Sequence, residues 1–203
     1  DPDEGIACVD DAGRYLEVLE KLVLEYDQVR FIPLVKKLTR FILYMEKNGR
    51  WYNFIYEDGS INKTHINSEL SFKFWAVRAM RGLAASYLIF KEVEPNPAIL
   101  ASIKKAISRA EQYFTGAALD QEKEQSYLLN NASDMTSELL LALTKLHSTG
   151  DFNYYPEIVK LSDGLMANQI LDSTSELDGM YFCWEKIWHS GGKNQALALA
   201  QAY

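Results

Sequence analysis

The most constraining feature of this 203-residue chain is a spacing of apolar residues by three or four that continues almost from end to end. Residues at that spacing lie on one face of an α-helix, so the spacing predicts an all-α fold. No segment shows the alternation of a strand, and only 51–56 suggests a short extended piece. We expect seven helices, with apolar stripes at about 9–27, 34–45, 76–87, 99–114, 135–146, 158–165 and 196–203.

The linkers between these helices alternate between short and long. The long ones follow the second, fourth and sixth helices, at about 49–68, 116–131 and 172–193. Alignment of the odd helices on Leu22, Leu83 and Leu146 gives steps of 61 and 63 residues. This period exceeds that of most two-helix solenoids. It predicts long antiparallel hairpins around an axis, with linkers 49–68 and 172–193 at the same end.

Three short segments accompany this pattern, CVDDAGRYL at 8–16, FWAVRA at 74–79 and GKNQALALA at 192–200. Together they resemble segments of the six-hairpin α/α toroids of many glycosidases, polysaccharide lyases and sugar epimerases. The resemblance implies one α/α-toroid domain over 1–203 and a carbohydrate-active function. Because the chain holds little more than three hairpins, we interpret it as an incomplete ring and expect it to be a fragment of a longer chain.

Carboxylates recur near the beginnings of the odd helices. The alignment places Asp10, Ser71 and Asp134 twelve residues before the aligned leucines, and Asp11 and Glu69 lie beside them. In α/α toroids the long loops and the starts of the inner helices line one mouth. Glycoside hydrolysis needs one carboxyl group to protonate the leaving oxygen and another to activate water or attack carbon. The catalytic candidates are therefore Asp10 or Asp11, then Asp134, with Glu69 behind them.

These acids also have a structural interpretation. Asp and Ser are favoured helix caps, which would explain Asp10 and Asp134 without any chemistry. Asp10 and Asp11 are adjacent and repel each other, so the second acid needs a reason of its own. A salt bridge from Asp11 to Arg14 would supply it.

Two long linkers concentrate aromatic residues. Segments 49–66 and 179–190 hold three of the four tryptophans, and they begin alike, GRWYNF at 49–54 and GMYFCW at 179–184. Aromatic faces can stack on sugar rings, while indole N–H and phenol O–H groups can bond hydroxyls. The alternative is a set of hydrophobic clusters that dock each loop on the helix ends. The candidate binding residues are Trp51, Tyr52, Tyr181, Trp184, Trp188 and His189.

Net charge, apolar runs and the spacing of cysteines and histidines limit the kinds of partner and cofactor that we expect. A net charge of −7 argues against nucleic-acid binding. No apolar run approaches the roughly 18 residues of a membrane-spanning helix. Neither the two cysteines, Cys8 and Cys183, nor the histidines have metal-site spacing, so we expect no metal, and hydrolysis needs no cofactor. The oligomeric state stays open, and the sequence leaves the compartment unknown with the cytoplasm slightly favoured.

The leading hypothesis is a glycoside hydrolase that uses paired carboxylates and aromatic platforms on a saccharide. The first alternative is a non-catalytic helical-repeat module that binds a glycan or a protein. The second is a sugar epimerase or isomerase, which would need histidines in the mouth. Only His65 and His189 are placed for that role.

Overall fold

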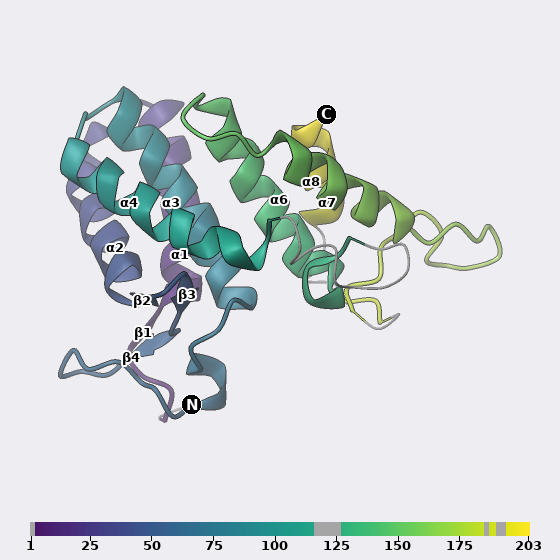
Figure 1. Cartoon of the computed structure of the whole chain (residues 1–203), viewed down its shortest axis with the longest axis horizontal. Coiled ribbons are helices and arrows are strands. Elements are labelled where there is room, and N and C mark those ends of the chain that lie inside the picture. The colour runs from purple at the N-terminus through teal and green to yellow at the C-terminus, as the bar shows by residue number, and fades with distance from the viewer. Residues whose placement is uncertain (1–2, 116–126, 185–186, 190–193) are drawn as a thin grey trace. The chain divides into compact units, whose positions relative to one another are not determined.

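A computed structural model describes residues 3–115, 127–184, 187–189 and 194–203. The all-α class predicted from the periodicity is confirmed, with seven helices among the described residues and strands of only two residues each (Figure 1). The sequence predicts one domain, whereas the structure divides into two compact units. Unit 1 is Asp1–Tyr113 and unit 2 is Phe114–Tyr203, and each is described by itself.

Unit 1 contains the first four predicted helices, with ends shifted by a few residues. They are α1 Val9–Leu24, α2 Ile32–Tyr44, α3 Phe74–Glu92 and α4 Pro97–Ala110. Short 3-10 turns lie at Val29–Phe31, Ile66–Ser68 and Glu111–Tyr113. Helix α1 begins after an extended Cys8 and carries acids in its first turn, where they interact favourably with the helix dipole. Helix α4 has proline in its first turn, where the missing N–H costs nothing.

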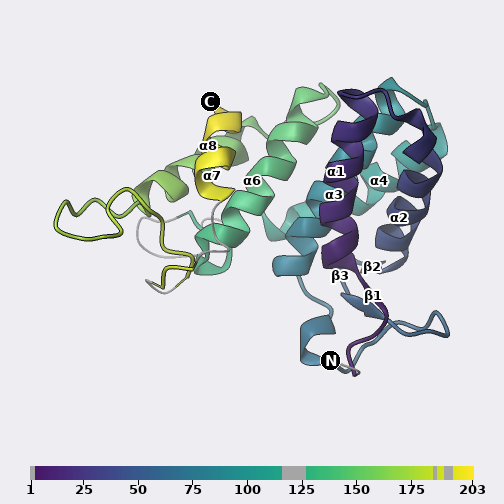
Figure 2. The ribbon, with the colours of Figure 1, turned by 180° about the vertical axis from the view of Figure 1, so that it is seen from behind.

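Helices α1 and α3 lie side by side and approach very closely (Figure 2). Glycines make this possible, because a Cβ on Gly13 would stand 2.4 Å from the carbonyl oxygen of Arg78, and one on Gly82 would stand 2.7 Å from the Cα of Gly13. Two helices can pack backbone to backbone only where side chains are absent. The close approach aligns the amino end of α1 with the first turns of α3.

Two small antiparallel pairs lie near the amino end of α1 (Figure 2). Strand β1, Ala7–Cys8, pairs with β4, Phe54–Ile55, and β2, Glu46–Lys47, pairs with β3, Arg50–Trp51. The turn between β2 and β3 is Asn48-Gly49, with φ of 54° and 76°. Positive φ at both central residues is the geometry of a tight hairpin turn. Asn-Gly is also a common end of a helix, so the sequence predicts that the second helix ends there. Helix α2 instead ends earlier, at Tyr44.

Unit 2 contains the last three predicted helices. Helix α6, Ser133–Ser148, packs against both α7, Tyr155–Ala167, and α8, Asn194–Ala202. A short 3-10 turn, Leu129–Asn131, leads into α6. Much of the predicted linker 116–131 falls in 116–126, outside the described residues.

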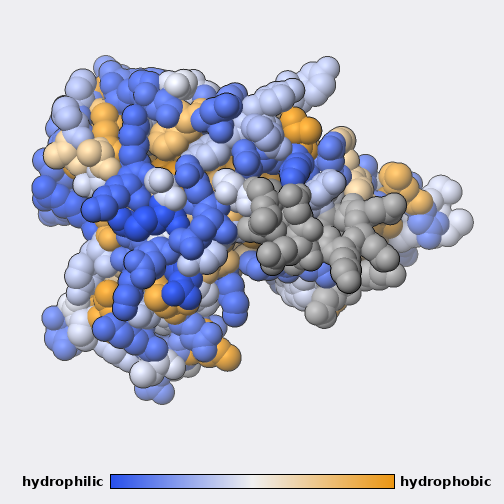
Figure 3. Space-filling view, viewed as in Figure 1, coloured by the Kyte–Doolittle hydropathy of each residue, from blue (hydrophilic) through white to orange (hydrophobic). Residues whose placement is uncertain are grey.

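The sequence predicts that the apolar stripes of the first, third and fifth helices are buried together. Each stripe is buried within its own unit, and a core shared by all three stays a prediction. Every residue of the predicted inward stripes is fully buried, and each buried leucine contributes roughly 1.5–3 kcal/mol. On the face seen in Figure 3, hydrophobic residues appear as separate patches on a largely hydrophilic surface. The toroid arrangement, and the common end expected for linkers 49–68 and 172–193, stay predictions because these linkers belong to different units. The stripe residues are Leu16, Leu19, Ala76, Met80 and Leu83 in unit 1 and Leu139, Leu143 and Leu146 in unit 2.

Candidate functional site

The predicted acids of unit 1 are engaged in ion pairs. Asp10 pairs with Arg78 of α3, and its carboxylate also lies 3.8 Å from Arg14. Asp11 pairs with Arg14, which confirms the predicted salt bridge. The Arg78 guanidinium lies 4.0 Å from the centre of the Phe74 ring, so it is held on two sides. The pair of Asp10 with Arg78 joins α1 to α3, whereas the pairs with Arg14 lie within α1.

The capping interpretation is wrong for the amino end of α1. The cap of α1 is Cys8, whose Sγ accepts from the Asp11 amide at 3.4 Å, while Asp10 lies in the first turn. In unit 2, α6 likewise follows Ala132, and Asp134 lies inside the helix. Burial raises the pKa of the Cys8 thiol to about 11, and the carboxylates of Asp11 and Asp10 add to the rise.

The predicted aromatic platform of unit 1 is not at the surface. Trp51 is 0% exposed, and its indole N–H donates to the carbonyl of Ile42 at 3.1 Å. The indole of Trp75 in turn donates to the carbonyl of Trp51 at 2.7 Å. The structure therefore corrects the prediction for Trp51, because an indole with no exposed face cannot stack on a sugar.

The other predicted residues of unit 1 are spread over one loop region. Tyr52 is half-buried, and Glu69 is exposed just after the 3-10 turn Ile66–Ser68. His65 uses Nδ1 to accept from the Asn67 amide at 3.2 Å, which caps that turn. His65 thus has a local structural role.

The matching loop of unit 2 keeps its tryptophans at the surface. We define the aromatic loop as residues 179–184 and 187–189 (Figure 1). Trp184 is 37% exposed and Trp188 is 44% exposed. The rings of Trp184 and His189 lie 5.7 Å apart between centres, and burial raises the pKa of the half-buried Tyr181, which keeps its hydroxyl protonated. Four predicted binding residues therefore belong to one loop.

Backbone hydrogen bonds fix this loop against the amino end of α6. Trp184 forms an antiparallel bridge with Ala132, and the Ser133 amide donates to the carbonyl of Cys183 at 2.7 Å. Within the loop, the Cys183 amide donates to Ile187 at 2.8 Å, and the Ile187 amide donates to Trp184 at 2.7 Å. The backbone around Trp184 is thus paired on both sides.

This attachment brings one predicted acid close to the predicted platforms. Asp134 lies in the first turn of α6, two residues after the bridge to Trp184, and is partly buried. One turn later lies Glu138, which is 4% exposed and accepts a hydrogen bond from the Asn194 side chain at 2.9 Å. Glu138 was not predicted from the sequence, although a charge directly before the apolar run Leu139–Leu143 is a signal for a buried polar contact.

Side chains from α6, from α8 and from the residue that follows α7 add to the attachment. The buried Ser133 hydroxyl donates to the carbonyl of Phe182, and the Asn168 side chain donates to the same oxygen at 2.8 Å. Gln195 donates to the Ser133 hydroxyl at 2.9 Å. These three polar residues were also missed as site residues, and Gln195 stood out only as part of the segment at 192–200.

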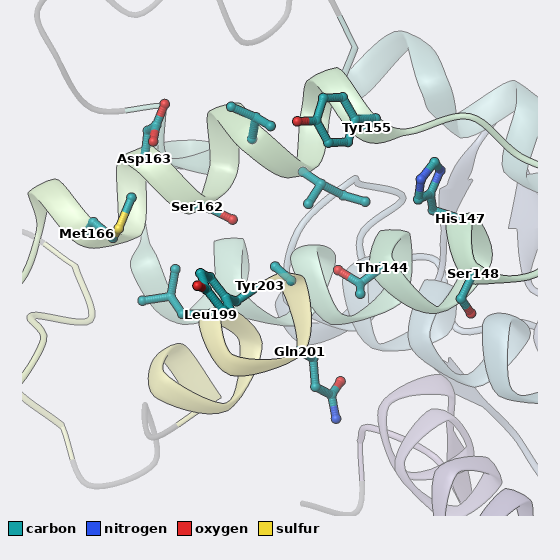
Figure 4. Close-up of a pocket in the computed structure, with 13 residues that line it drawn as sticks. Thr144, His147, Ser148, Tyr155, Ser162, Asp163, Met166, Leu199, Gln201 and Tyr203 are labelled. Carbon is teal, nitrogen blue, oxygen red and sulfur yellow. The ribbon is translucent and has the colours of Figure 1, made fainter.

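A groove of about 700 Å³ lies elsewhere in unit 2, between α6, α7 and α8 (Figure 4). Its lining includes His147, Tyr155 and Met166. The hydroxyl oxygens of Thr144 and Ser162, also in its lining, are buried and have no hydrogen-bond partner among the described residues. None of the catalytic or binding residues predicted from the sequence lines this groove, so it is not the predicted saccharide site.

Comparisons with known proteins give no assignment. A scan against protein-family models finds no match to this sequence, and a search of curated proteins finds none. Within the described residues, no group of three or more His, Cys, Asp or Glu side chains is placed to hold a metal ion. No helix in that part of the chain is both long enough and apolar enough to cross a membrane. Function is therefore inferred from geometry.

Proposed function

We propose that this chain binds a saccharide on the aromatic loop at the amino end of α6. The observation that carries the proposal is a pair of partly exposed indoles, Trp184 and Trp188, on a loop whose backbone is held by α6. Indole faces offer apolar area with little conformational freedom to lose, and their N–H groups can bond sugar hydroxyls. Tyr181 and His189 would add hydrogen-bonding groups beside them.

A binding experiment tests whether saccharide affinity depends on the tryptophans of this loop rather than on any exposed aromatic residue. Wild-type protein is titrated with cellohexaose, xylohexaose, mannohexaose and chitohexaose by calorimetry, and the tightest ligand is repeated on variants. Trp184→Ala and Trp188→Ala should each weaken binding about fivefold to tenfold, the loss of one aromatic contact of roughly 1 kcal/mol.

The matched control is Tyr155→Ala, which removes an aromatic side chain that is 64% exposed on α7, outside the loop. It should leave the affinity unchanged. Equal losses for Tyr155→Ala and Trp184→Ala would contradict the proposal, as would the absence of binding to all four hexasaccharides.

Hydrolysis of the bound saccharide is the second candidate function. It is favoured by two carboxylates of α6, the partly buried Asp134 and the 4% exposed Glu138, which follow the bridge of Ala132 to Trp184 in the chain. One would protonate the leaving oxygen while the other activates water or attacks carbon. If so, Asp134→Asn and Glu138→Gln should each lower turnover by orders of magnitude while binding persists. Binding without turnover would leave the non-catalytic module as the function.

A further inference from the structure

We propose that Gln195 positions the saccharide platform, acting through Ser133 on the backbone that carries Trp184. The expected effect on saccharide affinity rests on the proposed function, whereas the hydrogen bonds of Gln195 and Ser133 do not depend on it. Gln195 lies in the first turn of α8 and is 1% exposed. Through the Ser133 hydroxyl, Gln195 is connected to the carbonyl of Phe182 in the aromatic loop, one residue before Cys183.

The direction of the hydrogen bonds is set by chemistry. The carbonyl of Phe182 can only accept, so the single proton of the Ser133 hydroxyl points to it. The hydroxyl then accepts from the Gln195 amide nitrogen at 2.9 Å. Amide, hydroxyl and carbonyl therefore form one ordered chain in a buried setting, where successive hydrogen bonds polarise and strengthen one another.

The same carbonyl is held from a second side. The Asn168 side chain, just past the end of α7, donates to the Phe182 oxygen at 2.8 Å. A carbonyl oxygen has two lone pairs, and both are used here. The loop is thus anchored at one atom by residues from α6, the end of α7 and, through Ser133, α8.

The anchored atom lies close to the indole that the function requires. Phe182 is two residues before Trp184, which is itself bridged to Ala132. With both points fixed, the backbone between them keeps one conformation before a ligand arrives. A preformed site loses less conformational entropy on binding and so binds more tightly.

The presence of glutamine at this position supports a positioning role. Residues 196–200 of the same helix are Ala-Leu-Ala-Leu-Ala, and an apolar residue would bury equally well at position 195. A buried amide costs free energy unless it is hydrogen-bonded. The hydrogen bond from the Gln195 amide to Ser133 offsets that cost and, through Ser133, helps to fix the loop backbone.

The test replaces Gln195 by methionine, which has nearly the same shape and no donor. Hydrogen exchange is followed at the amides of Cys183 and Ile187 in the full chain. Exchange there should accelerate about fivefold, the effect of one net hydrogen bond, while the amides of Leu139–Leu143 in α6 stay protected. The matched control is Gln201→Met on the same helix, an exposed glutamine, which should change neither region.

A second pair of variants tests whether Gln195 acts through Ser133. Adding Gln195→Met to Ser133→Ala should accelerate loop exchange no further, because the chain is already broken. Unchanged exchange in Gln195→Met, or equal acceleration in the loop and in the α6 core, would overturn the proposal.

Affinity for the tightest-binding hexasaccharide gives the functional readout. Gln195→Met should weaken it about fivefold in the wild-type background and not at all in Trp184→Ala. An equal loss in both backgrounds would mean that Gln195 does not act through the platform. If the wild-type chain binds none of the four hexasaccharides, the proposed function fails, and loop exchange alone decides whether Gln195 positions the loop.

Discussion

The loops that begin GRWYNF at 49–54 and GMYFCW at 179–184 place their tryptophans differently. Aligned from their glycines, Trp51 matches Tyr181 and Phe54 matches Trp184. Trp51 is fully buried beneath the end of α2, whereas Trp184 keeps 37% of its surface exposed. In extended backbone, successive side chains point to opposite faces, so a shift in position decides which face an indole occupies. Two loops of similar composition therefore differ in tryptophan exposure: the loop of unit 1 buries Trp51 in the core, and the loop of unit 2 leaves Trp184 partly exposed.

The helix ends beside these loops differ in the type of side-chain contact that joins each helix to its neighbour. Helices α1 and α3 are joined by ion pairs, Asp10 with Arg78 and Glu17 with Arg81. The amino end of α6 is joined to α8 by amide side chains, through Gln195 to Ser133 and Asn194 to Glu138. The first end uses its acids to hold helices together. The second end uses neutral donors, one of which, Asn194, binds the buried carboxylate of Glu138.

Replacement of Trp51 by alanine should give the largest effect. The change removes a fully buried indole and its hydrogen bond to Ile42, so the free energy of unfolding should fall by about 3–5 kcal/mol. Trp184→Ala should cost less than about 1 kcal/mol, because its ring is partly in solvent. Urea unfolding of both variants measures the difference. Similar losses for the two would remove the contrast between the loops.

A smaller effect is expected at the amino end of α1. Asp10→Asn removes the negative charge that pairs with Arg78, which is mostly buried, and should cost about 1–2 kcal/mol. Asp11→Asn is the matched control, because the Asp11 side chain is 71% exposed and its pair with Arg14 contributes little. Thermal unfolding of the two variants decides the case. A silent Asp10→Asn with lost turnover would instead restore the catalytic interpretation of Asp10.

The smallest effect concerns the thiol that caps α1. Because burial raises the pKa of Cys8 to about 11, its thiolate fraction at pH 8 should be about one hundredfold below that of an ordinary thiol with a pKa of 9.0. Alkylation by iodoacetamide in a Cys183→Ala variant should accordingly be slow at pH 8 and accelerate as pH rises toward 11. Unfolding in urea should abolish the difference. Fast alkylation of the folded protein at pH 8 would mean that Cys8 is not held as the half-buried cap of α1.

Sequence periodicity was enough to locate the helices, because an apolar stripe at a spacing of three or four has one local solution. It also predicted the salt bridge of Asp11 to Arg14, a contact within one helical turn. It misplaced Trp51, because the face of a short extended segment depends on the hairpin turn at Asn48-Gly49, which folds Trp51 back onto the end of α2. It missed Glu138 and Gln195, whose roles depend on contacts 56 and 62 residues apart in the chain.

The most direct test of the account is fluorine NMR of protein labelled with 5-fluorotryptophan, in which each of the four tryptophans gives one signal. Signals are assigned with single Trp→Phe variants and followed during titration with the tightest-binding hexasaccharide. We expect the signals of Trp184 and Trp188 to shift with saccharide, while those of Trp51 and Trp75 do not. Shifts confined to Trp51 and Trp75, or no shift at any tryptophan, would contradict the claim that the aromatic loop of unit 2 is the saccharide site.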